Sequence, residues 1–322
     1  MKVKEISIDY TECISKAPVA PAQARIPGNV RATFKVKEPT EDALLPTWQQ
    51  RFYQSETPPR DRNVCTLRFY IPESIGPPIF MYYRLTNFYQ NHRKYVQSMD
   101  LDQLSGKAVV NTTIQSGQCG QYGHLDLDPA SRKPFYPCGL IANSQFNDSI
   151  QSPYLLNGRT EALYNMTNKG IAWSSDRHTV QKTSYKNDEV LPPPNWIKRY
   201  PEGYNDRYPI PNLSEDDDFL VWFRTAGLPD FSKLARRNDT TTMQKGYYSL
   251  DIEDRKLLFS RAFKQPATDL ALSFFFFFLW QILMLPDLVA PNRFLFRLAL
   301  LLGVKILLWA LPTWSSAAYA SS

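Results

Sequence analysis

The chain has 322 residues and a formal net charge of +6, and 43% of its residues are hydrophobic. This length is enough for one large domain or two modest ones, and the apolar share is enough for a packed core. Residues 1–255 hold 31 of the 37 basic and 29 of the 31 acidic side chains, so this part is almost neutral. A near balance of charge without a basic stripe excludes the usual classes of nucleic-acid-binding protein.

The first half of the chain predicts strands separated by irregular segments. Residues 14–62 are rich in proline and charge, and they predict no regular element. From residue 63 the apolar residues alternate, which predicts a half-buried strand with one buried face made of Cys65, Leu67, Phe69 and Ile71. Residues 77–88, "PPIFMYYRLTNF", predict an interior strand that runs towards solvent. Residues 92–106 predict a short helix that ends at Gly106.

The second half predicts further strands among long loops. Phe219–Arg224 predicts a strand, residues 231–237 predict one or two helical turns, and residues 246–254 alternate again. In that last segment Tyr248, Leu250 and Ile252 share one face. Several strands, long loops and little helix predict a mainly β fold, an antiparallel β-sandwich with large insertions.

Residues 256–322 form an atypical hydrophobic tail, distinct from a β-rich domain over residues 1–255. Leu270–Leu285 is 16 residues, about 24 Å as a helix and short of a hydrocarbon core of about 30 Å. Phe294–Leu311 is 18 residues but contains Arg297 and Lys305. The tail is therefore interpreted either as a poor membrane segment or as sequence that is not the natural continuation of the protein.

Five Asn-x-Ser/Thr sequons fall within residues 111–240, at Asn111, Asn147, Asn165, Asn212 and Asn238. Their density indicates a glycosylated, exoplasmic surface; the alternative is ordinary loops rich in Asn, Ser and Thr. The residues at the start of the chain have no apolar core of a signal peptide.

The chain has four cysteines, Cys13, Cys65, Cys119 and Cys138, and none lies in a Cys-x-x-Cys motif. An even number outside such motifs favours disulfides and an oxidising compartment over a zinc site, although four buried free thiols remain an alternative. Four cysteines allow three pairings, and nearest-neighbour pairing would close two separate loops.

Motifs for catalysis are absent from the sequence: the P-loop, G-x-S-x-G, H-E-x-x-H and dinucleotide patterns do not occur. Residues 214–219, "SEDDDF", lack the spacing of a calcium loop and predict a solvated acidic turn. Asp126 and Asp128 could be paired carboxylates of a glycosidase, but loop acids are far commoner. The three histidines are scattered. The chain is therefore predicted to be no enzyme, with no metal and no cofactor.

Four long sequence motifs carry a resemblance to a known family, and they occur in the order in which the family has them. They are "MYYRLTNFYQNHRKYVQS" (81–98), "CGLIANSQFNDS" (138–149), "GIAWSSD" (170–176) and "DFLVWFRTAGLPDFSKLARR" (218–237). Residues 4–255 resemble the cell cycle control protein 50 / ligand-effect modulator family, most closely its fungal members. These proteins are the non-catalytic β-subunits of type IV P-type ATPases, the phospholipid flippases.

The resemblance implies a disulfide-bonded, jelly-roll-like antiparallel β-sandwich on the exoplasmic side, between two membrane helices. It implies the pairs Cys13–Cys65 and Cys119–Cys138, and it places Asn147 on the sequon of the family. Neither the start of the chain nor residues 256–322 match the membrane helices of the family, so an incomplete or mis-spliced gene model is expected.

The aromatic and polar residues of the first motif suggest a surface that binds a partner protein. These residues are Tyr82, Arg84, Asn87, Phe88, Tyr89, Asn91, His92 and Arg93. Aromatic residues and arginine anchor protein interfaces. Two other interpretations stay open: polar side chains could satisfy buried backbone groups where strand meets loop, or the rings could stack on glycans.

By resemblance, the predicted function is that of an accessory subunit of a lipid-translocating ATPase. It would be needed for the exit of the catalytic subunit from the endoplasmic reticulum and for its stability and activity, and so for lipid asymmetry. Its partners would be the ATPase and membrane lipids, with no nucleic acid. The expected location is the membrane of the endoplasmic reticulum, Golgi, endosome or cell surface, with the main domain luminal or extracellular. The alternative function is a secreted or luminal lectin-like β-sandwich that binds carbohydrate.

Overall fold

The fold consists mainly of antiparallel sheets, seen in a computed structural model that describes residues 3–27, 30–34, 45–54, 61–121, 128, 131–157 and 160–254. In the described part, six strands of the largest sheet follow the order β2-β4-β5-β11-β8-β9, and β7 also pairs with β11. Two smaller sheets are the pairs β10-β6 and β1-β3. The strands are β1 (Ile6–Ser7), β2 (Ala24–Arg25), β3 (Arg31–Ala32), β4 (Thr47–Gln54), β5 (Asp61–Ile71), β6 (Ile79–Leu85), β7 (Ser149–Ile150), β8 (Tyr154–Asn157), β9 (Thr160–Leu163), β10 (Phe231–Asn238) and β11 (Gly246–Asp254).

The centre of the large sheet is the pair β5 and β11, which confirms the strands predicted from alternation. Their register joins Leu250 to Leu67 and Ile252 to Cys65. The predicted apolar faces are buried on both strands, with Leu67 at 2% and Ile252 at 2% exposure. On the other face of β5, Thr66 is also buried, and its hydroxyl donates to the Asp251 carboxylate at 2.7 Å.

Strands β6 and β10 form a separate two-stranded ribbon. The helical turns predicted for residues 231–237 are wrong, because this segment is strand β10 and pairs antiparallel with β6 from Phe231–Leu85 to Asn238–Ile79. The prediction of an interior strand for β6 is also wrong: within the described residues β6 pairs with β10 alone, and Phe80 and Tyr82 are exposed. Tyr83 is the one buried residue of β6, at 8% exposure, and Ile79, Met81 and Leu85 pack partly buried against the same core.

Among the described residues the helices are short, and the longest of them is α9, which replaces the strand predicted for Phe219–Arg224. The Asp216 carboxylate caps α9 by accepting from the Phe219 backbone N–H at 3.0 Å. Phe219, Leu220 and Trp222 are all buried, so the apolar run is a buried helix and not a strand. The helices are α1 (Cys13–Lys16), α3 (Arg93–Gln97), α4 (Leu101–Leu104), α5 (Asn111–Ser116), α6 (Gln118–Gln121), α7 (Leu140–Asn143), α8 (Ser174–Thr179) and α9 (Asp217–Phe223), with 3-10 turns η1 (Pro194–Trp196) and η2 (Leu213–Glu215).

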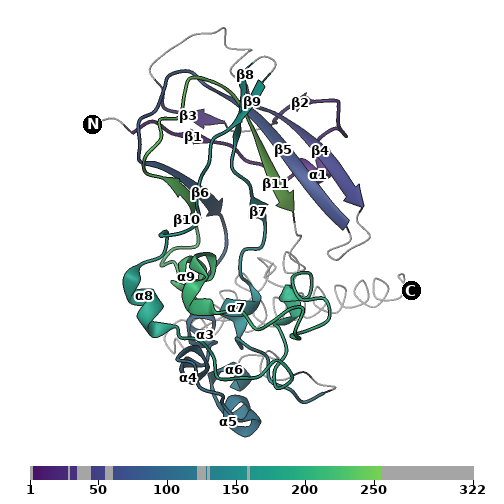
Figure 1. Cartoon of the computed structure of the whole chain (residues 1–322), viewed down its shortest axis with the longest axis vertical. Helices are drawn as coiled ribbons and strands as arrows, with labels where there is room; N and C mark the ends of the chain where they lie inside the picture. Colours follow the sequence, from purple (N-terminus) through teal and green to yellow (C-terminus); the bar gives the residue numbers. More distant parts are fainter. Residues whose placement is uncertain are drawn as a thin grey trace, which may run out of the picture. The chain divides into compact units, whose positions relative to one another are not determined.

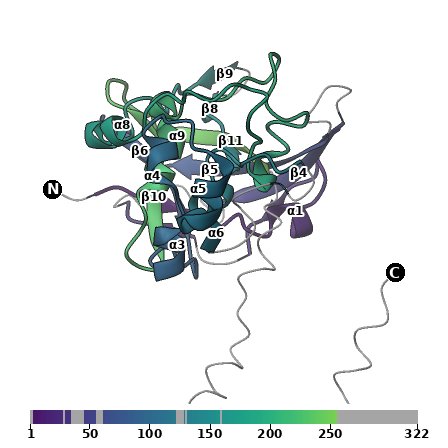
Figure 2. The same ribbon diagram turned by 90° about the horizontal axis from the view of Figure 1, so that it is seen from below.

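The predicted helix over residues 92–106 is two helices, α3 and α4, and Gly106 ends the second with a φ of 95°. Figure 1 shows β4, β5 and β11 together at one end and α3 to α9 grouped at the other end. Seen from below in Figure 2, α3 to α6 gather over the end of the strands. One buried cluster joins the two ends, because it contains Leu67 and Tyr248 of the large sheet together with Trp222 of α9. A second cluster contains Trp196, Leu213 and Phe219.

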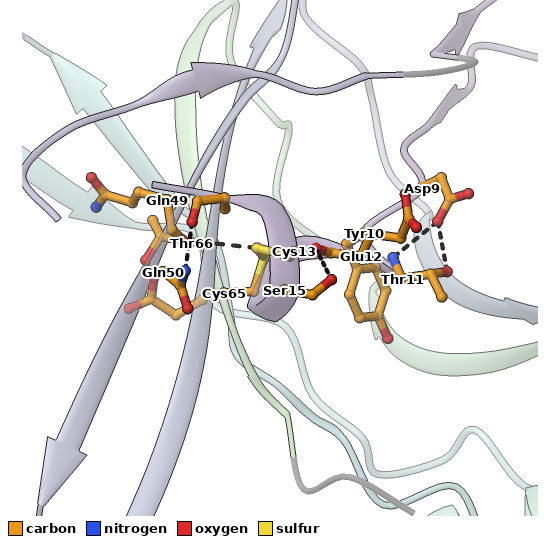
Figure 3. Close-up of a disulfide and its surroundings, with 12 residues drawn as sticks. Asp9, Tyr10, Thr11, Glu12, Cys13, Ser15, Gln49, Gln50, Cys65 and Thr66 are labelled. Atoms are coloured by element: carbon orange, nitrogen blue, oxygen red, sulfur yellow. Dashed lines mark hydrogen bonds between the residues drawn. A yellow bond between two sulfur atoms is a disulfide. The ribbon is translucent and has the colours of Figure 1, made fainter. Parts of the chain in front are cut away.

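Two disulfides are present, Cys13–Cys65 and Cys119–Cys138, and they are the pairs that the family resemblance implies. The first joins α1 to the centre of β5, and the Gln49 carbonyl lies 3.9 Å from the Cys13 sulfur (Figure 3). The second joins α6 to the segment before α7. Each end of the described fold therefore has its own covalent link.

The search of the described residues for a helix long and apolar enough to span a bilayer finds none. The hydrophobic tail, residues 256–322, lies outside the described residues, and so do His124 and Asp126.

The two disulfides are expected to contribute unequally to stability. By loop entropy, the 52-residue separation of Cys13–Cys65 contributes about 4 kcal/mol and the 19-residue separation of Cys119–Cys138 about 3 kcal/mol. Urea unfolding of the two double Cys→Ser variants would measure both losses. A larger loss for the Cys119–Cys138 variant would contradict this loop-entropy order.

Candidate functional site

Two loops meet at one end of the β6–β10 ribbon, because Leu85 at the end of β6 lies opposite Phe231 at the start of β10. Residues 86–93 leave the first strand and residues 224–230 enter the second. We call these two segments the loop pair. The two loops meet because of the register of the ribbon, although residues 94–223 of the chain lie between them.

Backbone hydrogen-bonding groups hold the loop pair together. The Phe88 N–H donates to the Pro229 carbonyl at 3.0 Å, and the Asn87 N–H donates to the Asp230 carboxylate at 2.9 Å. The Asn91 side-chain amide donates to the Gly227 carbonyl at 3.1 Å. Asn87 adopts a φ of 58°, a conformation that asparagine tolerates better than most residues. Asn91 thus bonds the backbone of the second loop with its side chain, whereas Asn87 contributes its backbone N–H and its positive φ.

A chain of buried polar groups ties the loop pair to the core. The Gln90 amide oxygen accepts from the Ala226 N–H at 2.9 Å, and its nitrogen donates to the Tyr95 hydroxyl at 3.2 Å. The Tyr95 and Ser144 hydroxyls lie 2.9 Å apart, and Ser144 donates to the Leu140 carbonyl at 2.7 Å. Gln90, Tyr95 and Ser144 are all under 5% exposed. Buried and fully paired, this chain fixes the loop pair in place.

The chain ends at α7, where the backbone carbonyls of the whole helix have side-chain donors. The Trp222 indole donates to Ile141 at 2.8 Å and the Trp196 indole to Ala142 at 2.9 Å. The Asn195 amide donates to Asn143 at 2.8 Å, and Ser144 serves Leu140. The Leu140 and Ala142 carbonyls also accept from the backbone N–H groups of Ser144 and Gln145, so the side-chain donors add to a hydrogen-bonding pattern that a helix this short leaves incomplete.

Gly139, which precedes α7, allows the close approach that this arrangement needs. Its φ is 92°, and a Cβ there would lie 2.1 Å from the Ser98 carbonyl oxygen. Only glycine fits such a position. Residues 138–144, "CGLIANS", therefore form the buried support of the loop pair.

Burial raises the pKa of the tyrosines in this support. It raises the pKa of the Tyr95 hydroxyl to about 12, although hydrogen bonds from Ser144 and Gln90 oppose the change. Burial also raises the pKa of Tyr83, whose ring stacks on Phe146 at 3.9 Å. Both hydroxyls stay protonated at neutral pH, so they act as hydrogen-bonding and packing groups.

Phe88 differs from the other residues suggested for a partner surface. Its ring makes edge contacts with Tyr95 at 6.0 Å, Trp222 at 5.6 Å and Phe231 at 6.2 Å. It packs against the core cluster and anchors the loop pair from beneath.

The remaining residues suggested by sequence face outwards. Tyr82 and Tyr89 are 56% and 55% exposed, and the exposed polar side chains are Arg84, Asn87, Asn91, His92 and Arg93. The His92 imidazole caps α3 by accepting from the Lys94 N–H at 3.3 Å. Sequence reasoning thus selected a segment whose surface is aromatic and basic.

Sequence reasoning missed an exposed tryptophan beside the loop pair. Trp173 is 67% exposed and lies 5.0 Å from the guanidinium of Arg224, which stacks over its ring. Arg224 is held by two hydrogen bonds to Asp176, at 3.0 and 2.8 Å. Leu228, in the second loop, is 69% exposed. Trp173, Arg224 and Leu228 lie inside the motifs "GIAWSSD" and "FRTAGLPDF", and these motifs are the sequence feature that could have identified them.

Lys233 of β10 lies buried under the second loop, with 7% exposure. Its ammonium donates to the carbonyls of Val221 at 2.8 Å and Trp222 at 3.1 Å, and it also donates to the Arg224 carbonyl. A cation at the end of a helix pairs with the unsatisfied carbonyls there. Burial, and then the nearby Arg224 charge, lower the pKa of Lys233 to about 8.

The acidic stretch at residues 214–219 is not the solvated turn that the sequence predicts. Asp216 caps α9, and Asp217 is 2% exposed, where it pairs with Arg177 and accepts from the Gly170 N–H at 2.6 Å. Asp128 accepts from the Ser131 N–H at 2.7 Å within a turn. The search of the described residues for clustered metal-binding side chains finds none.

The five sequons occupy different environments. Asn111 and Asn165 are exposed, whereas Asn147, Asn212 and Asn238 are half-buried. The Asn238 amide donates to the Asn165 carbonyl at 2.7 Å, so these two asparagines are neighbours. Asn147 lies in the wall of a cavity of about 290 Å³ that opens beside Tyr83 and β10.

The described part is a β-rich domain with two disulfides and an exposed aromatic and basic loop surface. Residues 1–257 match the family described as "LEM3 (ligand-effect modulator 3) family / CDC50 family", and the chain belongs to this family.

Two fungal relatives are named as accessory subunits. The chain is 41% identical over 258 residues to "Phospholipid-transporting ATPase accessory subunit CDC50" of Chaetomium thermophilum, covering 78% of the chain and 63% of the relative. It is 39% identical over 260 residues to "Phospholipid-transporting ATPase accessory subunit CRF1" of Saccharomyces cerevisiae, covering 79% and 60%. "Cell cycle control protein 50A" of Bos taurus is 37% identical over 203 residues, or 59% and 54%. The chain therefore spans somewhat over half the length of these relatives.

Replacing Gln90 by Ala is expected to destabilise the fold by about 2 kcal/mol, because the buried Ala226 N–H and Tyr95 hydroxyl lose a partner. The matched control is Asn91→Ala, which removes one exposed hydrogen bond and should cost less than about 1 kcal/mol. Urea unfolding measures both changes. Equal losses would show that the buried chain does not hold the loop pair.

Lys233 predicts a rise in stability at alkaline pH. Its pKa is about 8 in the fold and 10.5 as a free side chain, so the unfolded chain binds more protons between these values and stability increases with pH. From pH 8 to 9.5 this site should add on the order of 1–2 kcal/mol to the free energy of unfolding. The measurement compares this increment in wild type and Lys233→Met. The increment should be smaller in the variant, and an unchanged increment would refute the assignment.

Proposed function

We propose that this chain is the exoplasmic part of an accessory subunit of a phospholipid-transporting P-type ATPase. The observation that carries the proposal is the family match over residues 1–257, together with relatives whose names describe that role. In this role the chain performs no reaction of its own. It supports the exit of the catalytic subunit from the endoplasmic reticulum, its stability and its activity, and through these the asymmetry of membrane lipids.

The proposed domain arrangement has residues 1–255 as a glycosylated, β-sandwich ectodomain and residues 256–322 as a separate hydrophobic tail. The packing of Tyr83 of β6 in one buried cluster with Trp48 and Leu67 of the large sheet supports a second layer against that sheet. The two disulfides support an oxidising compartment. The proposed location is a membrane of the secretory or endosomal system or the cell surface, with this domain luminal or extracellular.

The loop pair and its neighbour Trp173 form the proposed docking surface for the ATPase. Tyr89, Trp173 and Leu228 offer exposed apolar contact area, and Arg84 and Arg93 offer positive charge. Tyrosine, tryptophan and arginine are the residues that most often dominate the binding energy of an interface. Because buried hydrogen bonds hold the loops, docking requires little ordering of this surface and so loses little entropy.

Co-purification tests the proposal. The full chain is co-expressed with the type IV P-type ATPase of the same genome, and the ATPase is expected to co-purify with it. Replacing Tyr89 and Arg93 together by Ala should reduce the recovered ATPase at least about tenfold, because each is a potential hot spot. The matched control replaces Tyr53 and Arg51 of β4, a tyrosine and an arginine on the sheet.

Two results would contradict the proposal. Absence of the ATPase from the wild-type sample would refute the accessory role. Equal recovery with the Tyr89/Arg93 and Tyr53/Arg51 variants would keep the role but remove the docking surface from the loop pair.

A further inference from the structure

The cavity of about 290 Å³ beside Asn147 is lined by charged groups of both signs. Three carboxylates, Asp148, Asp216 and Asp218, meet three cationic side chains in its walls. Arg199 pairs with Asp216 at 3.4 Å, and the other two acids and two bases leave the walls without net charge, which favours a neutral ligand over a phosphate or a metal ion. Carboxylates accept hydrogen bonds and guanidinium groups donate them, so the walls suit a ligand that carries several hydroxyl or amide groups.

Individual groups in the walls support this interpretation. Asp218 is exposed, and one of its oxygens accepts from the Asn168 amide at 2.8 Å. Arg236 is fixed by donating to the carbonyls of Ile150 at 2.6 Å and Met166 at 3.3 Å, which holds its guanidinium at the cavity. Such polar groups, fixed in advance, are what a site needs to select one ligand orientation.

Aromatic rings complete the cavity. Tyr83 and Phe146 stack with 6° between their planes, and Trp196 forms a further part of the wall. Rings beside hydrogen-bonding groups suit a ligand with one apolar face and a hydroxylated edge, as a pyranose has. A volume near the lower end of small-molecule pockets accommodates a single sugar and not a branched oligosaccharide.

One wall residue can carry such a sugar covalently. Asn147 begins the sequon Asn147-Asp-Ser149, and both ends of the sequon line the cavity. We propose that the cavity holds the first N-acetylglucosamine of an N-linked glycan on Asn147. The other sugars of the glycan extend into solvent.

Covalent attachment makes weak sugar contacts sufficient. A tethered ligand binds at an effective concentration in the millimolar range, so a low intrinsic affinity still fills the site. The glycan then acts as part of the fold at Asn147, in contrast to the exposed Asn165. The inference goes beyond the accessory role, and needs from it only that the domain passes through the endoplasmic reticulum.

The experiment measures how fast each glycan is released from the folded protein. The full chain is expressed behind a cleavable signal sequence in a eukaryotic host and treated, without denaturant, with peptide N-glycosidase F. Site-by-site mass spectrometry is expected to show release at Asn147 at least about tenfold slower than at Asn165, since the enzyme must wait for local opening. After denaturation the two sites should react equally fast.

Variants of the wall separate sugar binding from mere burial of the linkage. Asp218→Ala removes a sugar acceptor, and Ala235→Trp fills the cavity from β10. Both should accelerate native release at Asn147 and leave Asn165 unchanged, whereas Asp188→Ala, outside the cavity, should alter neither. If Ala235→Trp does not fold, Asp218→Ala decides alone.

Three outcomes would overturn the proposal. The first is an Asn147 that carries no glycan, and the second is native release at the rate of Asn165. The third is protection that survives in the folded wall variants, because burial by the backbone alone would then account for it. Failure of the ATPase to co-purify would leave this result untouched, so the two proposals fail independently.

Discussion

The loop surface depends on the four carbonyls of α7 (Leu140–Asn143) and on the side chains that bond them. Trp222 comes from α9, Trp196 and Asn195 come from η1, and Ser144 directly follows α7; each donates to one carbonyl of this single helical turn. The Leu140 and Ala142 carbonyls also accept from the backbone N–H groups of Ser144 and Gln145, and the side chains complete the pairing of this short turn. Both α9 and η1 must therefore pack against α7 for their donors to reach it.

Long-range contacts then explain why the proposed docking surface is preorganised. The chain of groups from Leu140 through Ser144, Tyr95 and Gln90 ends at the backbone of Ala226. It connects the helical end of the domain to the loop pair. Lys233 of β10 also holds the second loop, because its ammonium donates to the Arg224 carbonyl. The exposed side chains of Tyr89 and Trp173 are thus presented by backbone that has little freedom.

The cavity at Asn147 is built from the same elements that support the loop pair. Residues 145–150 follow directly after α7, so the turn that supports the loop pair also sets one wall of the cavity. β10 contributes Arg236 to the cavity and Lys233 to the loop pair. The proposed docking surface and the proposed sugar site therefore share the same supporting elements.

The sequence by itself determined the centre of the large sheet and the class of the protein. The alternation of apolar residues located β5 and β11. A strand with a buried face has apolar residues at every second position, and this pattern is visible within the strand's own sequence. The four sequence motifs identified the family, and the family resemblance implied the two cysteine pairs. Residue spacing alone left all three pairings open.

Tertiary structure decided the identity of the apolar runs and the meeting of the loops. Residues 217–223 became a helix because the Asp216 cap and burial on several sides outweigh the strand propensity of aromatic residues. Residues 231–238 became a strand because β6 offered a partner edge. The loop pair, its support from α7 and the exposed Trp173 all depend on contacts between residues far apart in the chain. Local periodicity carries no information about such contacts.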